Sequence, residues 1–358
     1  MMTRFTSSGP RAVSMGVAAF AIFALVLSCT GGAPSYIVVE PSRPAPDATT
    51  PILRATEGDS VVNARFQHVA FHMWPGVVLQ LDALIGRMHS TRTDAVVSFD
   101  DKASFVLGID SGVVGISMND LSRLMNTYVF AYRGAPLKDL SFSADGARLV
   151  QRGVLHKVVD IPFEMIGDVS ATSSGEIRVH PMSMKICSIP GQGLMEALGI
   201  TLSQLIDVSK AKGVRVDKND LLLDPTRLLP PPAISGHLAN VKVETTRLVQ
   251  YFASASNHVP LSAVVPDSDA ANYMLFHGGT LQFGKLFMVH ADMEVLDTTP
   301  SDPFDFDIAH YHEQLVAGSH RTTPNDGLLV FMPDLAKLAT ETHTGVVHAG
   351  AGLDSTVR

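Results

Sequence analysis

Alternation of apolar and polar residues is the feature that most constrains the fold of this 358-residue chain. The segments that show it are 69–73, 77–81, 105–109, 140–144 and 159–165. Because a strand points successive side chains to opposite faces, this period of two predicts strands that bury one face. Pro75-Gly76 and Asp145-Gly146 follow two of these segments and are typical hairpin turns. We therefore predict a meander of long antiparallel strands.

Two segments have helical periodicity instead. From Met118 to Tyr132 apolar residues recur three and four positions apart, and Ser117 and Asp120 resemble a capping box. This pattern predicts a helix of about 16 residues with a broad apolar stripe. A second helical region is expected at Leu194–Val208, with a break at Gly199 and a restart at Thr201.

The last third of the chain predicts further strands. One starts at Leu281 and continues through a bulge at Gly284 to Val295, and the final strand is expected at Gly327–Met332. A helix is expected between them near Asp305–Ala317, with its polar start at Asp302–Asp307 and its end at Gly318.

The N-terminus indicates export. Arg4 and Arg11 precede an uncharged, largely apolar run, Ala12–Leu27, which is shorter than the roughly 20 residues of a membrane-spanning helix. The run ends just before Cys29, so the segment resembles a bacterial lipoprotein signal, which implies lipidation of Cys29 after cleavage. An ordinary secretory signal and a single transmembrane anchor are the alternatives.

Charge and cysteine content exclude several functions. Loss of Arg4 and Arg11 with the signal changes the net charge from −8 to −10, and no Lys/Arg run remains to bind nucleic acid or anionic lipid headgroups.

The chain has two cysteines. If Cys29 carries lipid, Cys187 has no disulfide partner within the chain, and its place after an apolar run favours a buried structural role.

These observations divide the chain into four parts. They are a signal peptide at 1–28, a Pro-rich tether at 29–60, a single domain at 61–337 and a disordered tail at 338–358.

The order of elements within the domain is distinctive. After the helix from Met118 come long strands, the last of which reads Gly175-Glu-Ile-Arg-Val-His-Pro-Met-Ser-Met, then a hydrophobic helix pair and Gly213-Val-Arg-Val-Asp-Lys-Asn-Asp-Leu-Leu-Leu-Asp. This order resembles the bacterial branch of the tubular lipid-binding (TULIP) proteins, which are related to bactericidal permeability-increasing protein. The resemblance spans about 60–335. It implies an α+β fold in which a long curled antiparallel sheet wraps amphipathic helices around an elongated apolar trough.

A trough of this kind would bind acyl chains by removing their surface from water, at roughly 0.8 kcal/mol per CH₂. The resemblance therefore implies a lipid ligand and no catalytic residues. The ligand-facing residues expected on the helices and strands are Leu121, Leu124, Met125, Tyr128, Phe142, Ile161, Phe163, Leu198, Leu202 and Leu205. No cofactor is expected.

Other polar clusters are better explained by structure than by chemistry. His310 and His312 face apart on a helix, and His68 and His72 lie about 13 Å apart along a strand, so neither pair predicts a metal site. The acidic group Asp217, Asn219, Asp220 and Asp224 lacks the EF-hand pattern and predicts a polar turn. Lys285 is expected at a sheet edge, with a contact to lipid phosphate as the alternative.

The sequence thus favours a non-enzymatic, lipid-anchored protein of the cell envelope that binds or shuttles a lipid. It would face the periplasm, and Thr30 rather than Asp after the cysteine favours the outer membrane. Two alternatives stay open: a structural or assembly lipoprotein with a dry core and a protein partner in the envelope, and a hydrolase of unknown type.

We expect the Cys29→Ser variant to leave the membrane fraction while keeping its fold, because the anchor is the acyl group on that cysteine. Membrane fractionation followed by mass measurement of the mature chain tests this. Recovery of the variant in membranes as an uncleaved precursor would show that the first segment is a transmembrane anchor.

Overall fold

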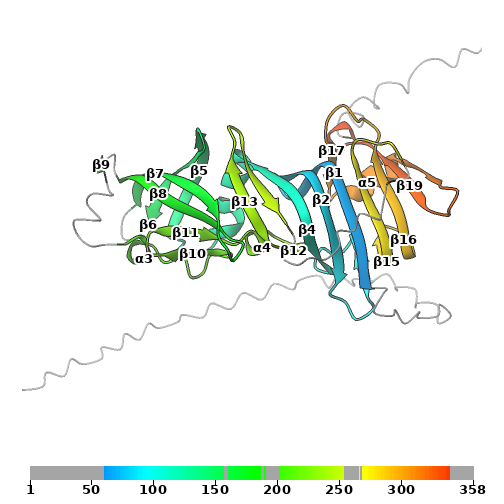
Figure 1. Cartoon of the computed structure of the whole chain (residues 1–358), viewed down its shortest axis with the longest axis horizontal. Helices are drawn as coiled ribbons and strands as arrows, with labels where there is room; N and C mark the ends of the chain where they lie inside the picture. The colour runs from blue at the N-terminus through cyan, green and yellow to red at the C-terminus, as the bar shows by residue number, and fades with distance from the viewer. Residues whose placement is uncertain are drawn as a thin grey trace, which may run out of the picture. The chain divides into compact units, whose positions relative to one another are not determined.

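The computed structural model describes residues 60–156, 160–186, 189–190, 201–253, 266 and 268–338, which belong to one compact unit. Strands make up 58% of these residues and helices 13%. The described part is a β protein with two sheets, so the predicted α+β class is wrong (Figure 1). Residues 1–59, with the predicted signal and tether, and residues 339–358 of the predicted tail lie outside the described residues.

The larger sheet, sheet A, has the strand order β13-β14-β4-β2-β1-β15-β16-β19-β18, with β12, β17 and β3 paired to β4, β1 and β15. Its strands are β1 (Val61–Trp74), β2 (Val77–Ser90), β3 (Val96–Ser98), β4 (Phe105–Ser117), β12 (Ala233–Gly236), β13 (Leu238–Val243), β14 (Arg247–Phe252), β15 (Tyr273–Phe283), β16 (Leu286–Asp297), β17 (Phe304–Asp307), β18 (Ser319–Thr322) and β19 (Leu328–Met332). The hairpin predicted at Pro75-Gly76 joins β1 to β2. Gly76 has a φ of +68°, a left-handed conformation that strains other residues, so this turn favours glycine.

Strand β1 changes partner at His68. Along its first half it pairs with β15, from Asn63 to Gln67, and along its second half it pairs with β17. His68 itself has a φ of +48° and takes no part in either ladder, while the register with β2 is the same on both sides of it, with Gln67 opposite Ala83 and Val69 opposite Leu81. A residue in this left-handed conformation interrupts the extended backbone and resets the side-chain alternation. This is why Phe66 and Val69 are both buried although three positions separate them.

Strand β4 divides in the same way. Val106–Ile109 pair in parallel with β12, whereas Gly112–Ser117 pair with β14. Its register with β2 shifts at Gly86, where a Cβ would lie 2.2 Å from the carbonyl oxygen of Gly108. Strands β1 and β4 therefore each pair with different neighbouring strands along their two halves, and each strand bends between the halves.

An aromatic cluster joins the last third of the chain to sheet A. The ring of Phe99 lies 5.0 Å from Phe283 and 5.4 Å from Phe276, and Phe283 lies 4.7 Å from Tyr311. The Tyr311 hydroxyl accepts a hydrogen bond from the Gly284 amide at 2.9 Å and donates one to Asp100. Burial, together with the Asp100 carboxylate, raises the pKa of Tyr311, so the hydroxyl keeps its proton.

Two predictions for this third are wrong in detail. Gly284 is not a bulge: with Lys285 it forms the two-residue turn between β15 and β16, and its φ is +62°. Lys285 is exposed on that turn. Asp302–Asp307 does not start a helix, because Phe304 and Phe306 alternate inward in β17, and helix α5 begins later and spans only Tyr311–Ala317.

The smaller sheet, sheet B, contains the part of the predicted meander from Leu140 onward and is drawn in green in Figure 1, whereas the predicted segments at 69–81 and 105–109 lie in sheet A. Its order is β10-β11-β8-β7-β6-β5, with β9 paired to β8. The strands are β5 (Leu137–Asp145), β6 (Arg148–His156), β7 (Asp160–Ala171), β8 (Ile177–Ile186), β9 (Ile189–Pro190), β10 (Val214–Asp217) and β11 (Asp220–Leu223). The turn after Asp145 contains Gly146 with a φ of +60°, as the predicted turn requires.

The predicted long helix is shorter than expected. Helix α1 covers Met118–Leu124 and continues as one π-helical turn, η2 (Met125–Val129), closed by a hydrogen bond of 2.9 Å from the Phe130 amide to the Met125 carbonyl. Ser117 caps α1 by accepting from the Asp120 amide, as predicted. The apolar stripe continues to Tyr132 in the sequence because the chain after η2 also packs on the core.

Polar side chains of α1 and η2 bind the edge of sheet B. Asn126 accepts from the Leu140 amide at 2.9 Å and donates to the Leu140 carbonyl at 2.7 Å. The Ser122 hydroxyl accepts from the Phe142 amide at 3.0 Å. These bonds satisfy groups of β5 that no neighbouring strand covers, so the helix is joined to the sheet and is not held away from it.

The other described helices are short. Helix α3 (Leu202–Leu205) starts with the predicted Thr201–Gln204 capping box, and α4 (Pro225–Leu228) is capped by Asp224. Residues 194–200 of the second predicted helical region lie outside the described residues. No helix of the described part is long and apolar enough to cross a membrane.

The predicted trough between a curled sheet and its helices is therefore absent from the described structure. The α1 stripe belongs to one apolar core that includes residues of both sheets, and Leu121 and Leu124 are 4% and 2% exposed. A sheet edge joined to a helix by hydrogen bonds leaves no room for a ligand between them.

We expect Leu124→Trp to destabilise the protein by about 1–3 kcal/mol, because the larger ring overpacks a closed core. The free energy of unfolding from chemical denaturation measures this. Thr127→Trp, on the exposed face of the same segment, is the matched control and should change it little. Unchanged stability of Leu124→Trp would show that space is present beside the helix.

The ion pair between His72 of β1 and Asp305 of β17 makes stability depend on pH. The hydrogen bond with Asp305 raises the pKa of His72 above its ordinary 6.5, against the effect of burial and with the help of the charges of Asp305, Asp307 and Asp120. Burial raises the pKa of Asp305, but its hydrogen bond and charge interaction with His72 lower the pKa below 3.8 overall. The ion pair therefore contributes its full stabilisation in the pH range between the ordinary pKa of Asp305 and the ordinary pKa of His72. It is lost as the pH rises through the raised His72 pKa or falls through the lowered Asp305 pKa.

We therefore expect His72→Gln to lower the melting temperature more at about pH 5.5 than at about pH 8.5. Thermal denaturation at the two pH values, with the exposed residue His320 replaced by Gln as the control, measures the difference. An equal loss at both pH values would mean that His72 acts by packing and not by charge.

Candidate ligand-binding site

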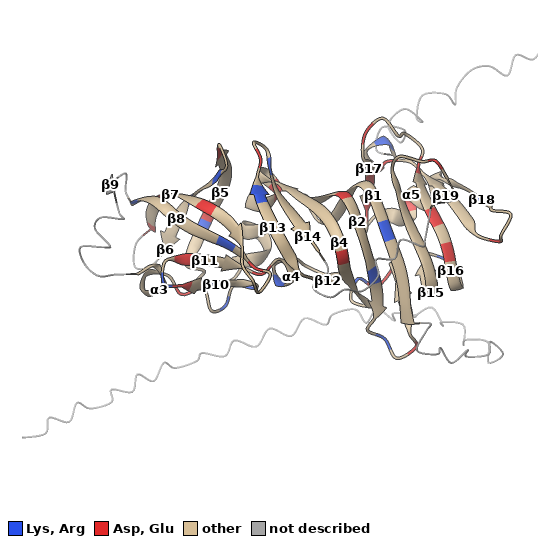
Figure 2. Cartoon of the chain, viewed as in Figure 1, with Lys and Arg blue, Asp and Glu red and all other residues tan. Residues whose placement is uncertain are grey.

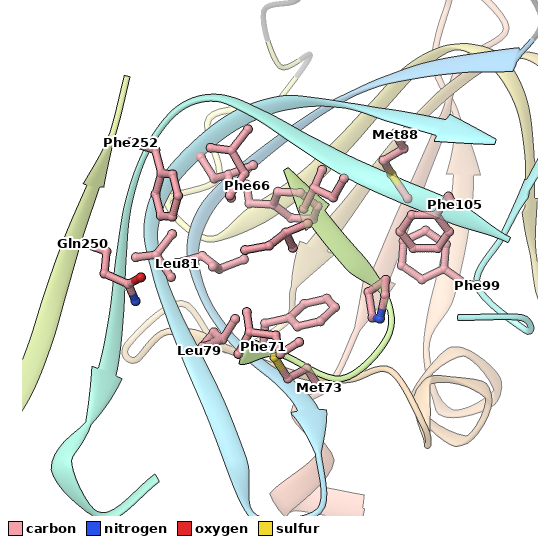
Figure 3. Close-up of a pocket in the computed structure, with 17 residues that line it drawn as sticks. Phe66, Phe71, Met73, Leu79, Leu81, Met88, Phe99, Phe105, Gln250 and Phe252 are labelled. Atoms are coloured by element: carbon pink, nitrogen blue, oxygen red, sulfur yellow. The ribbon is translucent and has the colours of Figure 1, made fainter. Parts of the chain in front are cut away.

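The first apolar pocket, the sheet A pocket, lies on the inner side of the bent strands β1, β2 and β4 (Figure 3). It has a volume of about 50 Å³. Its lining is Phe66, Phe71, Met73, Leu79, Leu81, Leu84, Met88, Phe99, Phe105, Leu107, Ile109, Val114, Leu229, Pro232, Ile234, Gln250 and Phe252.

The sheet A pocket is closed at its base and partly open at its rim. Leu84 and Met88 are each 1% exposed, whereas Leu229 before β12 and Ile234 within it are partly exposed. A space of this size holds only water-sized molecules unless its lining moves, and its cover is fixed because Ile234 belongs to β12, which is hydrogen-bonded to β4. We interpret the pocket as a packing gap left where the strands bend.

The second apolar pocket, the sheet B pocket, lies between the inner face of sheet B and helix α3, with a volume of about 40 Å³. It is lined by Leu137, Gln151, Leu155, Ile161, Phe163, Met165, Met184, Ile186, Leu202, Leu205, Ile206 and Leu221. Met165 at its base is 3% exposed, whereas Ile161, Phe163 and Leu205 are partly exposed. Like the sheet A pocket, where Leu107, Leu229 and Ile234 are partly exposed, it therefore has an apolar rim that solvent reaches.

The polar turn between β10 and β11 holds the cover of the sheet B pocket. The Leu202 amide donates to Asn219 Oδ1 and the Ser203 amide donates to the Lys218 carbonyl, both at 2.9 Å. The acidic residues near 217–224 thus form a turn between strands, as predicted, and this turn also anchors the first residues of α3. Asp220 pairs with Arg178 and His180 beside it.

Gln151 is the one polar side chain in the lining of the sheet B pocket. It stands on β6 at a position where alternation from Leu149 and Leu155 points the side chain toward the core, and it is 3% exposed. Its Oε1 atom is buried and has no hydrogen-bond partner. No sequence motif predicts a role for Gln151, although a glutamine at an apolar position of a predicted strand is a signal that could identify it.

The nine predicted ligand-facing residues within the described part separate into three groups. Ile161, Phe163, Leu202 and Leu205 come together in the sheet B pocket. Leu121, Leu124, Met125 and Phe142 lie buried in the core and line neither apolar pocket. Tyr128 stacks between Trp74 at 5.4 Å and the Lys212 ammonium at 4.3 Å. Leu198 and the predicted lipidation site Cys29 lie outside the described residues.

A polar cleft of about 510 Å³ lies on the other face of β1 and β2, between Arg247 and Lys337. Arg247 bonds Asp82 at 3.0 Å and Glu244 at 2.8 Å, and Lys337 bonds Asp334 at 2.7 Å. Its hydrogen bonds with both carboxylates raise the pKa of Arg247. The lining also includes Asp302 and Asp305, and Asp305 pairs with His72, so we interpret the cleft as an acidic surface joined by ion pairs.

His310 and His312 contact different carboxylates. Nδ1 of His310 lies 3.3 Å from Asp307, while Nε2 of His312 lies 2.7 Å from Asp100. Among the described residues, no group of His, Cys, Asp and Glu is arranged to hold a metal ion. Figure 2 shows basic and acidic residues interspersed along the strands of both sheets.

The sheet B pocket is thus the site in the described structure that combines an open apolar rim with a buried, unpaired polar atom. Its geometry fits a ligand that is apolar along most of its length. No protein-family model matches the chain, and no curated protein and no solved structure is significantly similar to it.

Proposed function

We propose that this protein is a lipid-anchored protein of the cell envelope that binds the acyl chain of a lipid in the sheet B pocket. The observation that carries the proposal is the lining of this pocket, which is aliphatic, aromatic or thioether except at Gln151. Such a surface binds hydrocarbon by removing it from water, and each CH₂ contributes roughly 0.8 kcal/mol. The proposal depends on this pocket and not on the architecture of the TULIP proteins.

The size of the pocket limits how the ligand enters. A volume of about 40 Å³ is far below the roughly 300–1,000 Å³ of a typical ligand site. A chain therefore inserts only if the rim residues Ile161, Phe163 and Leu205 move apart. Met165 and Met184 favour such an adjustment because thioether side chains repack at little expense in free energy.

The membrane attachment belongs to the same proposal. Acyl groups on Cys29 and the Pro-rich residues that follow would keep the domain near the bilayer, facing the periplasm and with the outer membrane as its favoured site. Attachment through lipid suits a chain with net charge −10 after loss of the signal, because it has no electrostatic attraction to anionic headgroups.

A second candidate is a structural or assembly lipoprotein with a protein partner in the envelope. The small volumes of both apolar pockets and the burial of the α1 stripe favour it. The two candidates differ in whether the purified protein carries lipid.

We expect native mass spectrometry of the full chain with Cys29→Ser, mixed with membrane lipid extract, to detect bound single-chain lipid. Ile161→Trp should lower that occupancy about tenfold or more, because the indole fills the pocket at a partly exposed site that tolerates the larger ring.

Ser170→Trp is the matched control, since Ser170 is an exposed residue of the same strand. Melting temperatures of the variants establish that both fold. Absence of lipid from the parent protein, or equal occupancy in the Ile161→Trp variant, would exclude the pocket as a lipid site and favour the assembly lipoprotein.

A further inference from the structure

We propose that Gln151 is the residue that selects the ligand, and that the ligand is a single-chain lipid with a neutral hydrogen-bond donor such as a hydroxyl at its polar end. The proposal rests on the proposed function and goes beyond it by naming the ligand class. Its basis is the buried, unpaired Oε1 atom of Gln151 in an otherwise apolar lining.

The surroundings of Gln151 supply no partner for this oxygen. In the sheet register Gln151 lies opposite Phe142 of β5 and Met165 of β7. The other side chains of the pocket lining have no hydrogen on nitrogen or oxygen. The sheet itself therefore leaves the amide facing apolar groups, and a donor must come from what enters the pocket.

The unfavourable free energy of an unpaired buried oxygen determines which ligands are preferred. Such a group is destabilising because it has left water and gained no bond. A ligand that donates a hydrogen bond to it recovers the lost bond, whereas an isomeric ligand without a donor leaves the oxygen unpaired. The expected preference is about tenfold or more.

The charge of the lining decides between a hydroxyl and an ionised headgroup. The described lining residues include no Lys, Arg or His, so a carboxylate or phosphate at this depth would be buried without a counter-charge. An ionised carboxylate also cannot donate to Oε1. A neutral alcohol satisfies both conditions.

Gln250 provides a matched control. It is 8% exposed and is likewise the one polar side chain in the lining of the sheet A pocket, but it is not among the buried groups that lack a partner. Replacement of either glutamine by Leu removes an amide from an apolar pocket, so only the one that contacts ligand should change selectivity.

The test compares 1-tetradecanol with its isomer methyl tridecyl ether, which has no donor, by displacement of a fluorescent apolar probe from the full chain with Cys29→Ser. We expect the alcohol to bind about tenfold or more tightly than the ether. Gln151→Leu should abolish this preference mainly by weakening the alcohol, and Gln151→Met should do the same. Gln250→Leu should retain the preference.

The outcomes separate this inference from the function on which it rests. Equal binding of alcohol and ether by the parent protein, or a preference retained in both Gln151 variants, would overturn the role of Gln151 while lipid binding stands. Failure of both ligands to displace the probe would overturn lipid binding itself. Melting temperatures of the variants confirm that each comparison concerns folded protein.

Discussion

The divided pairing of β1 is the constraint on which the rest of sheet A depends. One strand forms ladders with β2 along nearly its whole length, with β15 before His68 and with β17 after it. The C-terminal third therefore pairs with β1, a strand near the start of the domain. The aromatic cluster that contains Phe99 and Phe283 packs the same region. The two partners of β1 meet at His68, whose φ of +48° interrupts the extended strand between them.

The two apolar pockets differ because their covers are built differently. The sheet A pocket is closed by a segment continuous with β12, which is hydrogen-bonded to β4 and cannot separate without breaking a ladder. The sheet B pocket is covered by a four-residue helix held at its start by the Lys218-Asn219 turn. Moving such a helix breaks few hydrogen bonds, so the smaller pocket is the one better suited to admit a ligand.

Local patterns predicted the strands well and the connections between elements poorly. Alternation identified the meander of sheet B and the β1–β2 hairpin, because half-buried strands have to show it. Around Gly284, alternation predicted one bulged strand instead of a hairpin, because β15 and β16 on either side of the turn bury the same kind of residue. Phe304 and Phe306 were assigned to a helix because acidic neighbours resemble a helix start, whereas their partner β1 lies far away in the sequence.

The sequence by itself determined which faces of the strands are buried, where most turns fall and that four of the proposed ligand-facing residues, Ile161, Phe163, Leu202 and Leu205, are apolar and partly or fully buried. Only the tertiary structure decided that these four meet in one pocket with Gln151, and that Leu121, Leu124 and Met125 lie in closed core. The physical reason is that periodicity depends on near neighbours in the chain. Whether a buried face meets another apolar face, a gap or an unpaired amide depends on strands and helices brought together from distant positions.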